Sequence, residues 1–207
     1  RLIHDRHGNR TSYPYSIHGE CIYSVGRKFI NQSLLTLAET MDNVRIHFRH
    51  KTLNVDIKEG ECEFELPNGE KKQVKTPVII GTDGAYSKVR SSLMKNTLVT
   101  FSQEYIDHGY LELCIPATDD GQFAMEGDHL HIWPRDEFMM IALPNQDKSF
   151  TVTLFMPFAS FNSIKTSDDL LNFFNIYFAD SISLIGADKL IRDFFSNDAG
   201  SLVSIKC

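Results

Sequence analysis

An apolar run that leads straight into a glycine-rich turn constrains the fold of this chain most. Residues 77–80 (Pro-Val-Ile-Ile) carry no charge, which is typical of a strand covered on both faces. Gly81-Thr82-Asp83-Gly84 follow directly, and a helix is expected from Ala85. Strands of this kind belong to parallel sheets that are packed between helices. The sequence therefore predicts an α/β fold.

Two further segments extend the predicted parallel sheet. Residues 22–25 form a short apolar run that ends at Gly26, and residues 44–48 alternate apolar and polar side chains with the period of a strand. Between them, apolar residues recur at three- and four-residue spacing, which predicts a helix with one apolar face. These residues are Phe29, Ile30, Leu34, Leu37, Ala38 and Met41.

Short strands of a different kind follow. Residues 53–57, 62–66 and 72–75 are separated by the turns Glu59-Gly60 and Asn68-Gly69, which predicts a β-meander inserted as a crossover. Beyond residue 100, strands at 110–115, 129–133, 138–143 and 150–156 indicate a second, antiparallel sheet. Helices then follow the capping segment 167–169, and residues 201–206 read as a final strand.

Composition excludes several classes of protein. The net charge of -6 over 207 residues leaves no general attraction to phosphate backbones, so no nucleic acid partner is expected. The four cysteines form no C-x-x-C pair, which favours a reducing compartment over a disulfide framework. Apolar stretches such as residues 138–143 are far too short to span a membrane, so we expect this segment to be soluble. The chain begins at Arg1 and stops within a predicted strand, and we interpret it as part of a longer protein.

Two places have the physical features of a nucleotide site. Asp83 and Gly84 stand between a predicted strand and a helix N-terminus, where Asp83 either accepts a ribose or ribityl hydroxyl or simply caps the helix. Arg27 begins the helix after residues 22–25, where a guanidinium either reaches a pyrophosphate or remains solvated. Both alternatives stay open at each position.

An apolar strand face is the other candidate binding surface. Met139, Ile141 and Leu143 share one face of a strand, and Leu130 and Phe155 are candidates for the same face on neighbouring strands. Such a face either packs in the core or accepts a flat aromatic ligand.

Metal and hydrolase chemistry find no support in the sequence. His129 and His131 form an H-x-H pair, but alternation predicts that both rings face solvent on the side opposite Leu130, and no third ligand has suitable spacing. No Gly-x-Ser-x-Gly elbow and no cysteine nucleophile motif occurs.

The motifs together resemble a known family. Residues 81–90 with Ser24-Val25-Gly26-Arg27 resemble the FAD-dependent aromatic hydroxylases, and the segments 108–113, 130–135, 138–145 and 149–158 resemble the members that hydroxylate kynurenine. The resemblance runs from Arg1 to Cys207. It implies a Rossmann-like FAD-binding domain with a β-meander crossover at residues 1–100. It also implies a substrate domain at residues 101–207, built on an antiparallel sheet with C-terminal helices.

The resemblance also implies site residues. An Arg and a Tyr of the family hold the substrate carboxylate, and they correspond to Arg1 and Tyr15, a pairing that suits a carboxylate. The family's apolar pocket corresponds to Leu130, Met139, Ile141, Leu143 and Phe155, with Tyr110 as a further contributor. Contacts to FAD are implied for Arg27, Asp83 and Gly84, and less directly for Thr52 and Lys88. The family's Gly-x-Gly-x-x-Gly turn is missing from this chain, so we expect it to require the remaining parts of the polypeptide to hold FAD.

The implied activity is hydroxylation of L-kynurenine to 3-hydroxy-L-kynurenine with FAD, NADPH and O2. No protein nucleophile, acid or base is expected. The whole protein is expected at the cytosolic face of the mitochondrial outer membrane, through a C-terminal segment outside this chain. Two alternatives remain, a flavin hydroxylase of another aromatic substrate and a catalytically silent flavin-binding module.

Overall fold

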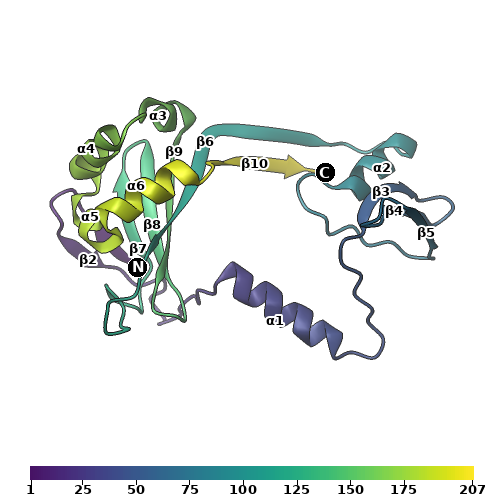
Figure 1. Ribbon diagram of the computed structural model, residues 1–207, viewed down its shortest axis with the longest axis horizontal. Helices are drawn as coiled ribbons and strands as arrows, with labels where there is room; N and C mark the ends of the chain where they lie inside the picture. The colour runs from purple at the N-terminus through teal and green to yellow at the C-terminus, as the bar shows by residue number, and fades with distance from the viewer. The chain divides into compact units, whose positions relative to one another are not determined.

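The structure is a computed structural model that describes all residues from Arg1 to Cys207. The chain forms two compact units, and each is described by itself (Figure 1). The first unit contains residues 1–33 and 105–202, and the second contains residues 34–104 and 203–207.

Most of a seven-stranded mixed sheet lies in the first unit. Its strand order is β10-β6-β9-β8-β7-β1-β2. The strands are β1 (Leu2–His4), β2 (Arg10–Ser12), β6 (Ser102–Ile115), β7 (His131–Arg135), β8 (Phe138–Pro144), β9 (Phe150–Pro157) and β10 (Gly200–Lys206). Strands β6 to β9 pair antiparallel, whereas β1 pairs parallel to β7. The antiparallel sheet and the final strand predicted from the sequence are thus confirmed.

One face of this sheet carries the core. Along β9, buried side chains alternate with half-buried ones, as the two-residue period requires. Helices α3 (Phe158–Ser163), α4 (Ser167–Tyr177), α5 (Ala179–Ile185) and α6 (Ala187–Ser196) lie beside the sheet (Figure 1). Their apolar side chains, such as Phe174 and Leu190, join the buried cluster that contains Trp133 and Leu154.

A capping box fixes the start of α4. The Thr166 hydroxyl accepts the backbone N–H of Asp169 at 3.1 Å, and the Asp169 carboxylate accepts the N–H of Thr166 at 2.9 Å. This reciprocal pair satisfies two N–H groups that a helix start leaves without partners. The sequence predicts the cap at residues 167–169, whereas the N-cap is Thr166 and residues 167–169 form the first turn of α4, with Asp169 making the second capping bond.

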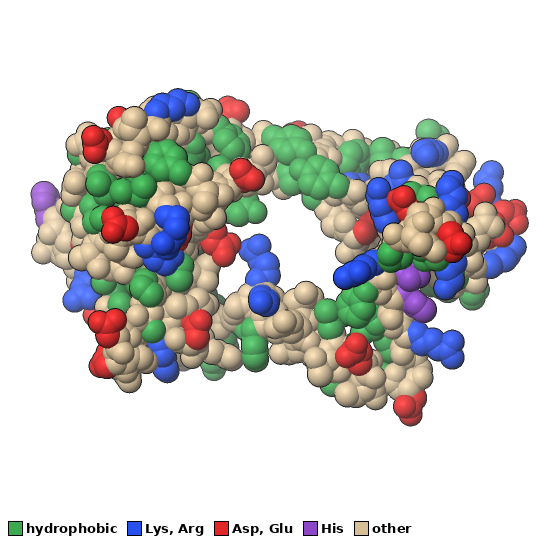
Figure 2. Space-filling view, viewed as in Figure 1, with side chains coloured by type: hydrophobic (Ala, Val, Ile, Leu, Met, Phe, Trp, Pro, Cys, Tyr) green, Lys and Arg blue, Asp and Glu red, His purple; other side chains and the backbone are tan.

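The second unit contains the meander that the sequence predicts. Strands β3 (Lys51–Asp56), β4 (Glu61–Glu65) and β5 (Lys71–Lys75) pair antiparallel, and helix α2 (Lys88–Asn96) packs on β3. Gly60 is required in the first turn, because its φ is +67° and a Cβ there would lie 2.4 Å from the carbonyl oxygen of Thr76. Acidic and basic side chains are intermixed on the visible surface of this unit (Figure 2), and Lys71 pairs with Glu63 at 3.1 Å.

Helix α1 (Arg27–Glu39) confirms the helix predicted from apolar spacing, but none of its residues is buried. Phe29, Leu34 and Leu37 are each more than half exposed. The helix crosses the boundary between the two units after Ser33. No helix of the chain is both long enough and apolar enough to cross a membrane.

Three predicted strands are absent. Residues 22–25, 44–48 and 77–80 have no strand structure, although their side chains have the expected apolar pattern. A strand needs a hydrogen-bonded neighbour, and these segments have none in this chain. Val78 and Ile80 are therefore 69% and 81% exposed. Helix α2 also begins later than expected, at Lys88, because the Ser87 side chain caps it.

The assignment of residues 1–100 to a flavin-binding domain and 101–207 to a substrate domain stays a prediction. In the structure, β1 and β2 belong to the same sheet as β6 to β9.

Replacing Phe174 by Ala tests the core. Its ring is fully buried and packs 5.5 Å from the ring of Phe178. We expect F174A to lower the free energy of unfolding by about 3–5 kcal/mol, measured by chemical denaturation. The control I176A removes a side chain of the same helix that is 56% exposed, and it should change stability by less than about 0.5 kcal/mol. Equal losses in both variants would contradict this assignment of the core face.

Candidate functional site

A cavity of about 520 Å³ in the first unit, the Arg1 cavity, contains the most predicted substrate residues. Arg1, Tyr15, Leu130 and Leu143 line it. Phe123, Asp128 and Gln146, for which no sequence motif gave a role, also line it, together with Asn145 and residues 21–24. The cavity thus combines a cation, a phenol and apolar side chains.

Backbone pairing at the end of β1 places Arg1. The backbone nitrogen of Arg1 donates to the carbonyl oxygen of Tyr13 at 2.8 Å, and the Tyr13 N–H donates to the carbonyl oxygen of Arg1 at 2.9 Å. The guanidinium carbon lies 5.2 Å from the centroid of the Tyr15 ring, within range of a cation–π interaction. The structure thus brings together the two residues implied to hold a carboxylate.

The predicted apolar side chains share the sheet face opposite the helices. In the register of the sheet, Met139 pairs with Phe155 and Phe155 with Tyr110, so these three form one row across β8, β9 and β6. Met140 and Leu154, which neighbour them in sequence, are fully buried on the helix side. Met139, Ile141, Phe155 and Tyr110 lie outside the lining of the Arg1 cavity. Their part in substrate binding stays a prediction.

The lining of the Arg1 cavity carries charges of both signs. Opposite in sign to Arg1 is Asp128, whose Oδ1 lies 2.7 Å from Nδ1 of His129. This hydrogen bond, with one from the backbone, holds the pKa of the Asp128 carboxyl below its ordinary value. Such a lining suits a ligand that carries both a carboxylate and an ammonium group.

A second cavity, of about 530 Å³, lies at the start of α1 and contains Arg27. Lys28, Gln32 and Asp147 also line it, and it shares Asn145 and Gln146 with the Arg1 cavity. Arg27 itself is exposed. The first turn of a helix has N–H groups without helical partners. These N–H groups and the two cationic side chains of the lining, Arg27 and Lys28, suit an anionic group. The cofactor role of Arg27 stays a prediction.

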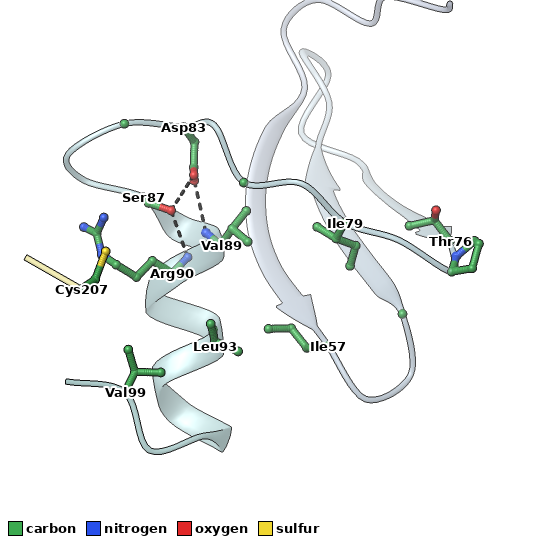
Figure 3. A pocket seen from close by; sticks show the side chains of 14 residues that line it. Ile57, Thr76, Ile79, Asp83, Ser87, Val89, Arg90, Leu93, Val99 and Cys207 are labelled. Carbon is green, nitrogen blue, oxygen red and sulfur yellow. Dashed lines mark hydrogen bonds between the residues drawn. The ribbon is translucent and has the colours of Figure 1, made fainter. Parts of the chain in front are cut away.

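Asp83 and Gly84 line a third cavity, of about 650 Å³, in the second unit (Figure 3). One Asp83 oxygen accepts the Ser87 hydroxyl at 2.5 Å, and the other accepts the N–H groups of Lys88 at 2.6 Å and Val89 at 3.2 Å. The Ser87 bond in particular holds the pKa of Asp83 below its ordinary value. Asp83 thus makes the capping contacts that the sequence offered as one alternative, whereas its cofactor role stays a prediction. Thr52 and Lys88 lie outside this lining.

Sequence reasoning was wrong about the surroundings of His131. Alternation correctly puts this side chain opposite Leu130, but that side is the helix-covered core, and His131 is fully buried. The ring bonds to His4, which is bonded in turn to Asp180 of α5. The sequence did contain one signal for this buried contact, because strand alternation puts His4 on the same face as the apolar Leu2 and opposite Ile3. No group of three or more His, Cys, Asp or Glu side chains is arranged to hold a metal ion.

Solved structures define the fold class. The chain superposes on a 2-methyl-3-hydroxypyridine-5-carboxylic acid oxygenase with a TM-score of 0.70 and 17% identity, over 99% of this chain and 52% of that one. It also superposes on the flavin-dependent halogenase CmlS with a TM-score of 0.57 and 14% identity, over 87% and 31% of the two chains. The chain therefore has the mixed α/β fold of flavin-dependent oxygenases.

Curated relatives narrow the class. The chain is 50% identical to kynurenine 3-monooxygenase of Anopheles gambiae, 46% to that of Sus scrofa and 40% to that of Candida albicans. Each alignment covers all of this chain and 43%, 44% and 46% of the respective relative. No family model matches. By sequence the chain is related to the kynurenine 3-monooxygenases over its whole length, and it spans less than half the length of the relatives it matches. The resemblance indicated by its motifs is confirmed.

Removing the Asp83 carboxylate tests its contacts at α2. We expect D83A to speed hydrogen exchange at the amides of Lys88 and Val89 by about five-fold, the size typical of a lost helix cap. The pKa of Asp83 is lowered in the folded state, so its contribution is present above about pH 4 and is lost as the pH falls further. The control D42A removes an exposed carboxylate of the same unit and should leave both amides unchanged. Unchanged exchange in D83A would contradict the cap.

Proposed function

We propose that this chain supplies the substrate pocket and part of the flavin site of an FAD-dependent monooxygenase that converts L-kynurenine to 3-hydroxy-L-kynurenine. The observation that carries the proposal is the Arg1 cavity, where a guanidinium and a phenol lie beside apolar side chains. Kynurenine has the matching parts, an amino acid end and an aromatic ring. The whole-length relation to kynurenine 3-monooxygenases supports the same substrate.

Binding and orientation are the tasks of this chain's residues. Arg1 and Tyr15 hold the carboxylate, because a guanidinium gives paired charge-assisted hydrogen bonds and the phenol adds one more. Asp128, on the lining of the same cavity, suits the ammonium group. Leu130, Leu143 and Phe123 contact the apolar part and exclude water, so that the ring is held for oxygen transfer. No residue is assigned as an acid or base.

In this proposal Arg27, Lys28 and the N-terminus of α1 hold the anionic part of a dinucleotide, and the carboxylates Glu112 and Asp147 on the same lining face its hydroxyl groups. FAD, once reduced by NADPH, supplies the activation of O2. The overall reaction balances as kynurenine, NADPH, a proton and O2 giving 3-hydroxykynurenine, NADP⁺ and water. We also place the whole protein at the mitochondrial outer membrane with NADPH as its reductant, and only the family resemblance supports this location.

The proposed activity is tested with the full-length protein. We expect L-kynurenine to stimulate NADPH consumption by the FAD-loaded protein, with 3-hydroxykynurenine formed in equal amount and detected by chromatography. Stimulation that yields only hydrogen peroxide would mean that kynurenine binds in the wrong orientation. A flavin-loaded protein without any stimulation would contradict the proposal and favour a silent flavin-binding module.

Arg1 is the residue on which substrate affinity should depend most. We expect R1A to raise the KM for L-kynurenine about ten- to a hundred-fold, because hydrogen bonds between charged groups are lost. R1K should recover part of the loss, since lysine keeps the charge without the paired geometry. The control R192A removes an exposed arginine of α6 and should leave the KM unchanged. An R1A variant with the normal KM would point to another aromatic substrate.

A further inference from the structure

Three hydrogen bonds, one buried and two partly buried, run from helix α5 through strands β1 and β7 beside the Arg1 cavity. Oδ2 of Asp180 lies 2.9 Å from Nδ1 of His4, and Nε2 of His4 lies 2.9 Å from Nδ1 of His131. Nε2 of His131 lies 2.9 Å from the carbonyl oxygen of Glu126. The His4 and His131 side chains are 2% and 0% exposed. We call these four residues the histidine chain.

The two ends of the histidine chain fix its proton count. The carbonyl oxygen of Glu126 can only accept a hydrogen bond, and an ionised Asp180 carboxylate can also only accept. Each of the three bonds requires one proton, so the two imidazole rings must carry three protons. Two neutral imidazoles carry only two. The histidine pair therefore holds one positive charge, which faces the negative charge of Asp180.

The surroundings of Asp180 and His131 agree with this count. Burial alone would raise the pKa of the Asp180 carboxyl. Hydrogen bonds from His4 and from the Trp133 indole hold this pKa below its ordinary value, and the indole nitrogen lies 3.0 Å from Oδ1 and 2.9 Å from Oδ2 of Asp180. Burial lowers the pKa of His131 and favours its neutral form. The His4 ring is stacked on the Trp133 ring, with the two ring centroids 4.0 Å apart.

The histidine chain is directly connected to the substrate pocket. Leu2 pairs with His131 in the parallel register of β1 and β7, and the N–H of Leu2 donates to the carbonyl oxygen of Leu130 at 2.8 Å. Arg1 immediately precedes Leu2, and Leu130 immediately precedes His131. Arg1 and Leu130 both line the Arg1 cavity. Strand β1 has only three residues, so few backbone bonds hold it in place.

We propose that Asp180, His4 and His131 are positioning residues for substrate binding, because their shared proton holds β1 against β7 and so holds Arg1 beside Leu130. This inference rests on the function proposed above. Without the additional proton, one of the three bonds has no hydrogen. Strand β1 then loosens, Arg1 loses its fixed place, and the KM for kynurenine rises.

Other charged groups act on members of the histidine chain. The Glu126 side chain and His129 interact electrostatically with His131, and Arg135 interacts with Asp180. Arg135 donates to the carbonyl oxygens of His4 at 3.0 Å and Asp5 at 3.1 Å, which places a fixed positive charge close by.

The first test replaces Asp180 by Ala in the full-length, FAD-loaded protein. Alanine removes both the negative charge and the acceptor for Nδ1 of His4, so this bond is lost. We expect D180A to raise the KM for L-kynurenine about ten-fold and to change kcat less than about two-fold. The control D188A removes an exposed carboxylate of α6 and should behave as the wild type. A KM of D180A equal to that of D188A overturns the proposal.

A second pair of variants tests the proposal even where D180A does not fold. In H131Q, the amide oxygen can accept from His4 and the amide NH2 can donate to Glu126, as the neutral histidine does. In H131L, a side chain of similar size can do neither. We expect H131Q to keep the KM within about three-fold and H131L to raise it about ten-fold. Equal effects would mean that His131 only fills space, and would overturn the proposal.

The proton count itself is read by NMR of the full-length protein with ¹⁵N-labelled histidine. We expect three protonated ring nitrogens and one unprotonated nitrogen in the His4–His131 pair at about pH 7. If only two nitrogens are protonated while kynurenine turnover is normal, the proposed role of the histidine chain is overturned and the proposed function stands. Three protonated nitrogens without kynurenine-dependent NADPH consumption overturn the proposed function, while the count stands.

Discussion

The parallel pairing of β1 with β7 is the interaction on which the candidate site depends. It joins the first residues of the chain to a strand that begins at His131, so that Arg1 and Leu130 line the same cavity. A contact between residues so far apart in sequence closes a long loop, and its entropic cost must be offset by local interactions. The burial of Leu2 and His4 and the bonds from Arg135 to the carbonyl oxygens of His4 and Asp5 supply them.

One face of the large sheet forms the core, and the opposite face is available for binding. Residues such as Trp133, Met140 and Leu154 point to the helices and are fully buried. Their neighbours in sequence point to the other face, where apolar side chains remain half-buried or exposed. Because the strand period is two, any strand that fills the core also presents a regular row of side chains on the other face. An apolar row there is not needed for the core of this unit, and this favours its use in binding a flat ring.

Predictions from sequence patterns were most successful for strands whose hydrogen-bonded neighbours are also part of this chain. The antiparallel strands 138–144 and 150–157 and the meander pair with sequence neighbours, so local periodicity and turn residues such as Gly60 were sufficient. Residues 22–25 and 77–80 have equally clear strand patterns, but periodicity cannot supply a neighbouring strand. His131 shows a related limit, because alternation gives the side of a strand and not what covers that side. Asn145 ends the segment 138–145 that carries part of the family resemblance, but the sequence does not show that it lines two cavities.

The position of Asn145 and Gln146 gives the two cavities of the first unit a physical relation. Both residues line the Arg1 cavity and the cavity at the start of α1, so a ligand in one is separated from a ligand in the other by this short turn. The Asn145 amide donates to Ser149 at 3.0 Å and to Thr151 at 3.1 Å, which fixes the turn to β9. A rigid partition suits a reaction that must hold a substrate ring near a separately bound cofactor, since oxygen transfer depends on fixed distance and orientation.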